Sequence, residues 1–192
     1  MSNIICMIRH GQTNVNHLRK IQGRREIPLN DTGRKQAADT ANYLKNNDSN
    51  WDFIYSSPLS RAFETASIIK NTINFEKDII IEDSFIERDF GDADGMDITD
   101  EIFKYIIADD VLNLEKSFEI QKRVSEGILK VCREHPNKKI LIVCHSHTIK
   151  ALLTFCDKNR TFLDTLYNCS MSYFTVENNI ISIDKTNIMP SN

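Results

Sequence analysis

The chain has 192 residues, of which 41% are hydrophobic and 27% charged, and its net charge is −3. This length fits a single domain over residues 1–192, and the slightly acidic balance argues against general nucleic-acid binding, which needs a strong basic excess. No apolar stretch approaches the roughly 18 residues of a membrane-spanning helix. From the charge balance and the absence of such a stretch, we expect neither a nucleic-acid nor a membrane partner.

The cysteines and the first residues indicate the compartment. The five cysteines are scattered and never form a C-x-x-C pair, and most have apolar neighbours, where a thiol behaves as a small hydrophobic group. The N-terminal stretch "MSNIICMIRHG" has neither the basic region nor the small-residue cleavage site of a secretory signal. We therefore expect reduced thiols and a cytoplasmic protein.

Short apolar runs alternate with amphipathic stretches along the chain. In chain order, the patterns predict a strand at 4–8, a helix after the loop "LNDTG", a strand at 53–57, a helix that starts at Pro58 with Ser57 as its N-cap, a strand at 79–83, a helix around 120–131, a strand at 139–144 and a helix around 149–156. The segments "MSYFTV" and "IISI", joined by Glu177-Asn178-Asn179, predict a closing hairpin.

Strands separated by helices are typical of βαβ units, which build a largely parallel sheet with helices on both faces. The runs at 4–8 and 139–144 are apolar at successive positions, as expected for strands that are covered on both faces. We therefore expect a three-layer α/β/α fold with a mostly parallel central sheet and a C-terminal β-hairpin at the sheet edge. In such folds ligands bind beyond the carboxyl ends of the strands.

Basic and imidazole side chains follow three of the predicted strands. Arg9 and His10 end the first, His145 follows the strand at 139–144, and Arg61 lies about one turn inside the helix after the strand at 53–57. Parallel strands bring these ends together, and helix N-termini attract anions. The pattern predicts a site for a tetrahedral dianion such as a phosphoryl group.

Four motifs, in this order, resemble the histidine phosphatase superfamily, which contains cofactor-dependent phosphoglycerate mutases and many related phosphatases. They are "RHGQT" with Asn16 shortly after it, "SSPLSRAFETA", "ERDFGDADG" and "VCHSHTIKALL". The resemblance extends to "IQGRREIPLNDTGRKQA" and "KSFEIQKRV" and so covers nearly the whole chain. It implies one domain with a short helical cap inserted at about residues 92–118.

The resemblance also implies a role for each matching residue. His10 would be the nucleophile that takes the phosphoryl group, and Glu87 the proton donor to the leaving group. The remaining implied contacts are Arg9, Asn16, Arg61 and His145 to the phosphoryl oxygens, and Gln22, Gly23 and Ser146 to the substrate. We expect no metal and no organic cofactor, and the oligomeric state stays open.

Three departures from the family pattern bear on the site. Ser146 stands where the family usually has glycine, and His147 is an additional histidine that we expect at the pocket rim or helix start. The segment "GDADG" lacks the bulky apolar residue that usually lies between its glycines, which leaves the packing of that loop open.

Other classes of enzyme can be weighed on the residues. A cysteine phosphatase needs a C-x5-R loop, which the chain lacks. A metallohydrolase could be built from His10, His145 and His147, although its strand ends should then carry carboxylates rather than arginine. A non-enzymatic phosphate-binding module on the same fold is a further alternative.

Within the family, a phosphatase competes with a phosphoglycerate mutase. A mutase holds its substrate carboxylate with paired arginines in the cap, whereas "MDITDEIFKYIIADDVLNLEKSFE" has only Lys104 and Lys116 among acidic residues. We expect this segment to cover the pocket with Ile102, Phe103, Ile106 and Ile107. The basic loop that carries Arg19, Lys20, Arg24 and Arg25 is either a solvated surface loop or, if it lines the entrance, a feature that favours substrates with a second anionic group. The sequence therefore predicts a metal-independent phosphomonoesterase that hydrolyses a small phosphorylated metabolite through a phosphohistidine.

Overall fold

The structure, a computed structural model, describes residues 2–190. Six strands form one mixed sheet in the order β3-β2-β4-β1-β5-β6. The strands are β1 (Asn3–Arg9), β2 (Phe53–Ser56), β3 (Ile80–Ile81), β4 (Lys139–Cys144), β5 (Met171–Glu177) and β6 (Ile180–Ile188). The first four are parallel, while β5 runs antiparallel to β1 and β6 antiparallel to β5. The predicted mostly parallel sheet with a C-terminal hairpin at its edge is confirmed.

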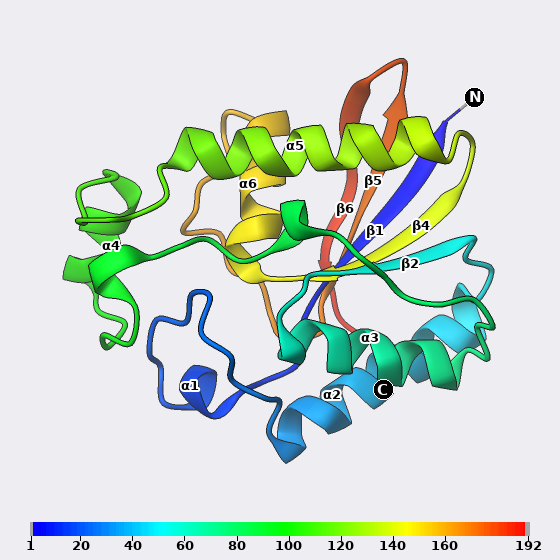
Figure 1. Cartoon of the computed structure of the whole chain (residues 1–192), viewed down its shortest axis with the longest axis horizontal. Helices are drawn as coiled ribbons and strands as arrows, with labels where there is room; N and C mark the ends of the chain where they lie inside the picture. Colours follow the sequence, from blue (N-terminus) through cyan, green and yellow to red (C-terminus); the bar gives the residue numbers. More distant parts are fainter. Residues whose placement is uncertain (1, 191–192) are drawn as a thin grey trace.

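Helices cover both faces of this sheet, as Figure 1 shows. The helices are α1 (Asn14–His17), α2 (Asp31–Asn47), α3 (Ser60–Thr72), α4 (Asp100–Ile107), α5 (Ser117–Glu134) and α6 (Ser146–Cys156), with short 3-10 turns at Asp83–Phe85 and Gly91–Ala93. Helices α2 and α3 pack on one face, and α5 and α6 pack on the other (Figure 1). The short α1 and α4 lie away from the sheet, at the end where the parallel strands finish (Figure 1).

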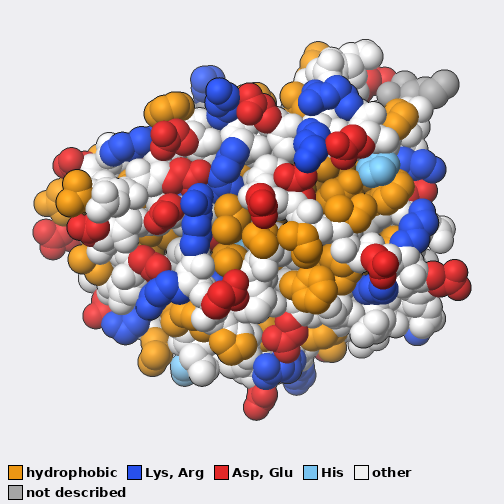
Figure 2. Space-filling view, in the orientation of Figure 1, with side chains coloured by type: hydrophobic (Ala, Val, Ile, Leu, Met, Phe, Trp, Pro, Cys, Tyr) orange, Lys and Arg blue, Asp and Glu red, His pale blue; other side chains and the backbone are white. Residues whose placement is uncertain are grey.

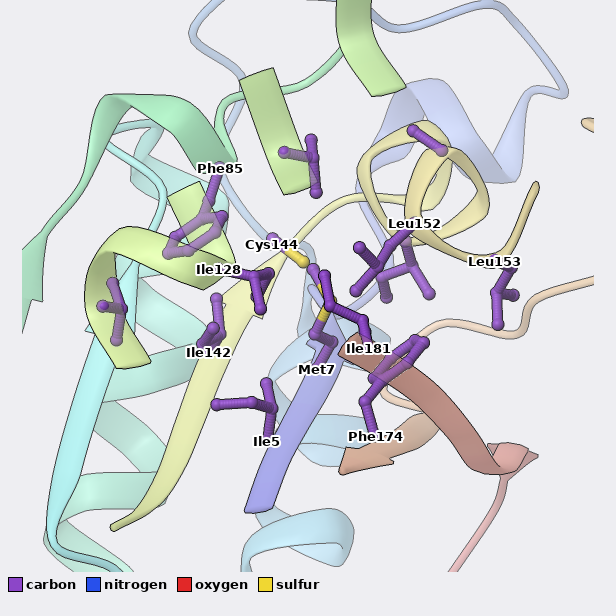
Figure 3. Close-up of a cluster of buried hydrophobic side chains, with 14 of the residues drawn as sticks. Ile5, Met7, Phe85, Ile128, Ile142, Cys144, Leu152, Leu153, Phe174 and Ile181 are labelled. Atoms are coloured by element: carbon purple, nitrogen blue, oxygen red, sulfur yellow. The ribbon is translucent and has the colours of Figure 1, made fainter. Parts of the chain in front are cut away.

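The central strands bury both faces because alternate side chains point to opposite sides. In β1, Ile5 and Met7 join the apolar cluster under α5 and α6, whereas Cys6 and Ile8 join the cluster under α2 and α3. Figure 3 shows the first of these clusters. A run of successive apolar residues is therefore what a strand in this position requires.

Strand β3 is shorter than predicted. It contains only Ile80 and Ile81, pairs with β2 alone and leaves both side chains partly exposed at the sheet edge. The chain then turns into a 3-10 segment whose N-cap is Glu82. The expectation of a strand over 79–83 is wrong because the acidic end of that run caps the next turn.

Helix α3 begins later than predicted. Its first residue is Ser60 and its N-cap is Leu59, which has no side-chain capping bond. Ser57 is not the N-cap, although its Oγ accepts a hydrogen bond from the Leu59 N–H at 3.3 Å. The expected start at Pro58 is wrong because Ser57 lies against His145 instead.

The cap predicted at about residues 92–118 is present as the 3-10 turn, α4 and the loop leading into α5. Its buried residues form a small separate cluster, in which Ala93 is fully buried and takes the place of a bulkier residue in "GDADG". Both glycines of that segment, Gly91 (φ 54°) and Gly95 (φ 89°), have a left-handed backbone that favours glycine.

The surface is mixed in charge. On the face shown in Figure 2, basic and acidic side chains lie interspersed among apolar ones. Within residues 2–190, no helix combines the length and the apolar character needed to cross a membrane. All five cysteines are free thiols.

Candidate active site

A cavity of about 260 Å³ opens beyond the carboxyl ends of β1 and β4. Six of the nine predicted site residues line it: Arg9, His10, Asn16, Gln22, Glu87 and Ser146. The other three, Gly23, Arg61 and His145, do not line the cavity. Its remaining wall comes from the cap, the 20–22 loop, the start of α6 and residues 163–166.

His10 follows β1 directly, and its two hydrogen bonds define its tautomer. The Nδ1 atom lies 2.7 Å from the Gly11 carbonyl oxygen, which can only accept, so Nδ1 carries the proton. The Arg61 Nε–H donates to His10 Nε2 at 3.2 Å, so Nε2 presents its lone pair. Burial, with Arg61 and Arg9 nearby, lowers the pKa of His10 well below its ordinary value and keeps the ring neutral.

Arg61 is a fully buried cation behind His10. Its guanidinium is held by two loop carbonyls, since Nη1 donates to Arg25 O at 2.9 Å and Nη2 to Gly23 O at 2.7 Å. Burial lowers the pKa of Arg61 to about 10, which still leaves it charged near neutral pH. The backbone carbonyl of Gly23 thus positions Arg61.

His145 is the N-cap of α6 and lies edge-on to His10, with 5.1 Å between the ring centroids. Its Nε2 is 2.7 Å from the Ser57 Oγ, which fixes the ring orientation. Burial, followed by the charge of Arg61, lowers the pKa of His145 well below its ordinary value. Its buried Nδ1 has no partner among the described residues.

The cavity wall offers further unsatisfied donors. Arg9 donates from Nη1 to Leu166 O at 2.6 Å, while its buried Nε has no partner among residues 2–190. Gln22 Oε1 accepts from Thr13 Oγ1 at 2.7 Å and from Asn16 Nδ2 at 3.2 Å, which leaves Gln22 Nε2 without a partner there. Buried donors without protein partners are rare in folded proteins, so this wall is suited to an acceptor-rich group. An anion with several acceptor oxygens satisfies them.

Ser146 occupies, without backbone strain, the position where the family usually has glycine. It is the first residue of α6 and does not have a positive φ. It lines the cavity beside His147.

Among the described residues, Glu87 and Asp164 are the two acidic residues of the cavity wall. Glu87 is 4% exposed and accepts from Arg88 N at 2.8 Å and His147 N at 3.3 Å. Burial raises the pKa of Glu87, and this effect outweighs the hydrogen bonds and cations that lower it. The carboxyl group therefore holds a proton more readily than a solvated one.

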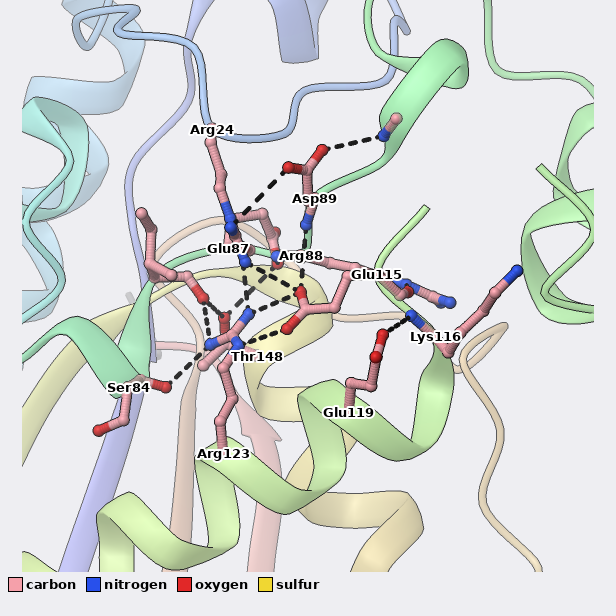
Figure 4. Close-up of polar contacts among 12 residues, drawn as sticks. Arg24, Ser84, Glu87, Arg88, Asp89, Glu115, Lys116, Glu119, Arg123 and Thr148 are labelled. Carbon is pink, nitrogen blue, oxygen red and sulfur yellow. Dashed lines mark hydrogen bonds and ion pairs between the residues drawn. The ribbon is translucent and has the colours of Figure 1, made fainter. Parts of the chain in front are cut away.

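Figure 4 shows how the backbone at Glu87 is held. Its carbonyl oxygen accepts from Arg24 Nε at 3.0 Å and Arg123 Nη2 at 3.2 Å. Arg123 also donates to the Ser84 and Ile86 carbonyls. Glu115 pairs with Arg123 at 2.6 Å and Arg24 at 3.2 Å. The loop that carries Glu87 is thus tied to α5 and to the 20s loop.

The predicted basic loop faces the cavity at one position only. Lys20 lines the cavity, with its Nζ 2.8 Å from Asp97. Arg19, Arg24 and Arg25 do not line it, and Arg24 and Arg25 form ion pairs with Glu115 and Asp94. The alternative in which these arginines line the entrance is wrong because carboxylates of the cap hold two of them.

The apolar cap residues also differ from expectation. Only Phe103 of the four named residues lines the cavity, where Ile98 joins it. Ile106 is fully buried in the cap cluster, and Ile107 packs against the main core. The helical periodicity of α4 turns these side chains away from the cavity.

Sequence reasoning missed several contributors. His147 lies at the start of α6, as expected, but it is buried in the cavity wall between Phe90 and Phe162, at centroid distances of 4.8 and 5.1 Å, rather than at the rim. Asn168 donates to His10 O at 2.9 Å, yet no motif marks it. Ser57 stands within a quoted motif, but its contact with a strand far along the chain is visible only in the fold.

The donor set does not suit a metal. Across residues 2–190, no group of three or more His, Cys, Asp or Glu side chains is arranged to hold a metal ion. The group that faces His10 Nε2 is the Arg61 guanidinium, a cation that cannot serve as a metal ligand. The arrangement provides instead a neutral imidazole, the buried guanidinium of Arg61, the partly buried guanidinium of Arg9 and a carboxyl group of raised pKa.

Comparison with known proteins agrees with this arrangement. The family model of the histidine phosphatase superfamily (branch 1) matches residues 5–189. The uncharacterized phosphatase PhoE of Bacillus subtilis (strain 168) is 44% identical over 137 residues, which are 71% of this chain and 68% of that protein.

Solved structures share the fold. A phosphoserine phosphatase of Entamoeba histolytica, solved as a mutant in complex with phosphoserine, superimposes with a TM-score of 0.82 and 26% identity over 96% of both chains. A phosphoglycerate mutase of Bacillus anthracis has a TM-score of 0.85 and 21% identity, over 97% of this chain and 93% of its own, and shows the shared fold alone. Because the family model matches residues 5–189, nearly the whole chain, this protein belongs to the histidine phosphatase superfamily.

Proposed function

We propose that this protein is a phosphomonoesterase that hydrolyses a small phosphorylated metabolite through a phosphohistidine at His10. The observation that carries the proposal is the tautomer of His10. His10 Nδ1–H donates a hydrogen bond to Gly11 O, and the Arg61 Nε–H donates to Nε2, so the imidazole is neutral and its Nε2 lone pair lies beside a cation. A neutral imidazole of this kind can attack phosphorus and split one difficult step into two.

The first step transfers the phosphoryl group. Nε2 of His10 gives up its hydrogen bond from the Arg61 Nε–H and attacks phosphorus, an N–P bond forms, and the bond to the ester oxygen breaks with its electron pair on that oxygen. Glu87 gives its proton to the leaving alkoxide, a role that its raised pKa supports.

Arg9 Nε and Gln22 Nε2, which belong to residues that line the cavity, supply unpartnered donors for the phosphoryl oxygens. His145, which lies edge-on to His10, carries a further unpartnered nitrogen, Nδ1.

The second step returns the enzyme to its starting state. Water attacks the phosphohistidine and gives a proton to the Glu87 carboxylate, and the P–N bond breaks with its electron pair on Nε2. Inorganic phosphate leaves, and Glu87 is again protonated. No step of this scheme requires a metal or an organic cofactor.

Two observations favour hydrolysis over the mutase reaction. The cap contributes Phe103 and Ile98 to the cavity but no arginine, and the two loop arginines that could replace a missing pair are bound to Glu115 and Asp94. A relative that binds phosphoserine and the relative named PhoE are both phosphatases. A small phosphorylated metabolite also suits a cavity of about 260 Å³.

The test follows the phosphoryl group. Wild-type protein mixed with a labelled phosphomonoester and quenched rapidly should carry the label on His10, as read by peptide mass spectrometry. His10→Ala should lose turnover by at least a thousandfold while keeping its circular dichroism spectrum, because the residue lies at the cavity rather than in the core. His17→Ala, at an exposed histidine of α1, is the matched control.

Two outcomes contradict the proposal. The first is a label on a residue other than His10, or undiminished turnover in His10→Ala. The second is rapid interconversion of 2- and 3-phosphoglycerate that depends on a bisphosphate primer, with negligible hydrolysis, which identifies a mutase.

A further inference from the structure

A lysine in the cavity wall has no role in the chemistry described above. Lys150 lies in α6, is 8% exposed, and lines the cavity. Its Nζ donates to Phe162 O at 2.9 Å. A lysine ammonium has three N–H groups, so two remain for another partner.

The geometry of α6 places this side chain in the cavity wall, with its Nζ at Phe162 O beside the 163–166 segment. In a helix the side chain leans toward the N-terminus and lies over residues three and four positions earlier. Those positions are His147 and Ser146, which line the same cavity. The charge of Lys150 also lowers the pKa of His147, as expected for close neighbours.

Two other charged groups of the wall, Lys20 and Asp164, already form ion pairs. Lys20 pairs with Asp97 at 2.8 Å, and Asp164 pairs with Arg160 at 3.3 Å. Within residues 2–190, no carboxylate lies at ion-pair distance from Lys150.

The charges that act on Lys150 come from every side of the cavity. They are Arg9 at the end of β1, Glu87 in its loop and Asp164 in the 163–166 segment. The neighbouring His147 ring on α6 is neutral because its pKa is lowered. Burial is the largest influence and lowers the pKa of Lys150 to about 8, against the opposing effect of Glu87 and Asp164. A buried cation without a counter-ion is costly, so a ligand anion is its natural partner.

We propose that Lys150 binds a second anionic group, a carboxylate or a second phosphate, on the alcohol portion of the substrate. The substrate class is then a short phosphomonoester with two anionic ends. His147 lies beside it, and its buried Nδ1, which has no partner among the described groups, serves as a further polar contact. The cation for the second anion thus comes from α6 and not from the loop that contains Arg24 and Arg25.

This inference depends on the proposed function only for its readout by turnover. The test compares three substrates of one carbon skeleton: glycerol 3-phosphate, 3-phosphoglycerate and glycerol 1,3-bisphosphate. The first has one anionic end, the second adds a carboxylate, and the third adds a phosphate. For the wild type, kcat/KM for the preferred doubly charged substrate should exceed that for glycerol 3-phosphate at least tenfold.

Substitutions at Lys150 test whether this residue causes the preference for doubly charged substrates. Lys150→Met should reduce this ratio at least tenfold, and Lys150→Arg, which keeps the charge, should retain most of it. Lys20→Met is the matched control, because Lys20 lines the same cavity but is paired with Asp97. The same loss in Lys20→Met, or an unchanged ratio in Lys150→Met, overturns the proposal.

The pH dependence provides an independent readout. In the wild type the ratio should be high below about pH 8 and fall above it, as the Lys150 ammonium loses its proton. Lys150→Arg should keep the ratio high to a higher pH, because a guanidinium stays charged. A wild-type ratio that stays constant across pH 7–9 contradicts the role of this ammonium.

Equilibrium binding separates this proposal from the proposed function. Calorimetric titration of His10→Ala and of the His10→Ala, Lys150→Met double variant with the same three compounds requires no turnover. Selective binding of the doubly charged compounds that disappears in the double variant supports the anion subsite even if the wild type hydrolyses none of them. Hydrolysis of all three with equal kcat/KM and equal affinity leaves the phosphatase standing and removes the subsite.

Discussion

At the scale of single residues, the site combines neutral imidazole rings with guanidinium groups that stay charged. Burial and nearby cations lower the pKa of His10, His145 and His147 well below ordinary values, so these rings are neutral in the free protein. The positive charge comes from Arg9 and Arg61, whose guanidinium groups stay charged when buried. This combination leaves a lone pair on His10 next to a strong field for an anion.

Glu87 provides the prediction at this scale. Glu87→Gln should lower kcat/KM about a hundredfold or more for an alkyl phosphate, whose alkoxide needs a proton as it leaves. The loss should be under tenfold for p-nitrophenyl phosphate, because its phenolate is a much weaker base. In the wild type, kcat/KM for the alkyl ester should fall as the pH rises through the raised pKa of Glu87, since the acid must arrive protonated.

The control is Glu101→Gln, at an exposed glutamate in the first turn of α4, which should leave both substrates unaffected. An equal loss for the two substrates in Glu87→Gln speaks against a proton donor.

At the scale of elements, α5 does more than cover the sheet. Arg123 projects from it to the carbonyl groups of Ser84, Ile86 and Glu87 and pairs with Glu115 (Figure 4). A loop without regular structure thereby acquires the rigidity that a catalytic group needs.

Arg123→Met should therefore lower the free energy of unfolding by about 3 kcal/mol, because it leaves the Glu115 carboxylate and three carbonyl groups short of partners. Urea titration followed by circular dichroism measures this change. The matched control, Arg133→Met at an exposed position of the same helix, should stay within about 0.5 kcal/mol of wild type. A loss in Arg123→Met no larger than that of the control would show that the cluster contributes little.

At the scale of the whole molecule, the sheet gathers cations and imidazoles at one edge and leaves no metal ligand set among the described residues. Under the proposed function, protein groups alone stabilise the charge that develops on the phosphoryl oxygens.

Activity should consequently survive exhaustive dialysis against a chelator, and vanadate, which mimics the five-coordinate phosphoryl species, should inhibit. Hydrolysis of a phosphomonoester before and after chelation measures this, with a zinc-dependent phosphatase treated in parallel as the control. Loss of activity that zinc or magnesium restores would instead support a metallohydrolase.

The local sequence pattern was sufficient to predict the order of the helices and strands and to place much of the candidate site. Successive apolar residues in β1 and β4 indicate strands buried on both faces, and the residues that end such strands must meet at one edge. Arg9, His10 and His145 could therefore be placed together from the sequence, because their positions follow from where each strand stops.

Only the tertiary structure decided how each group is charged and which cations face the substrate. The raised pKa of Glu87 depends on burial by segments distant in the chain, and the sequence pattern alone placed it equally well in solvent. Arg24 and Arg25 are taken up by carboxylates of the cap, whereas Lys150, hidden in an apolar helix pattern, lines the cavity. Periodicity records which side of an element is apolar, but burial and charge pairing depend on what the fold places opposite it.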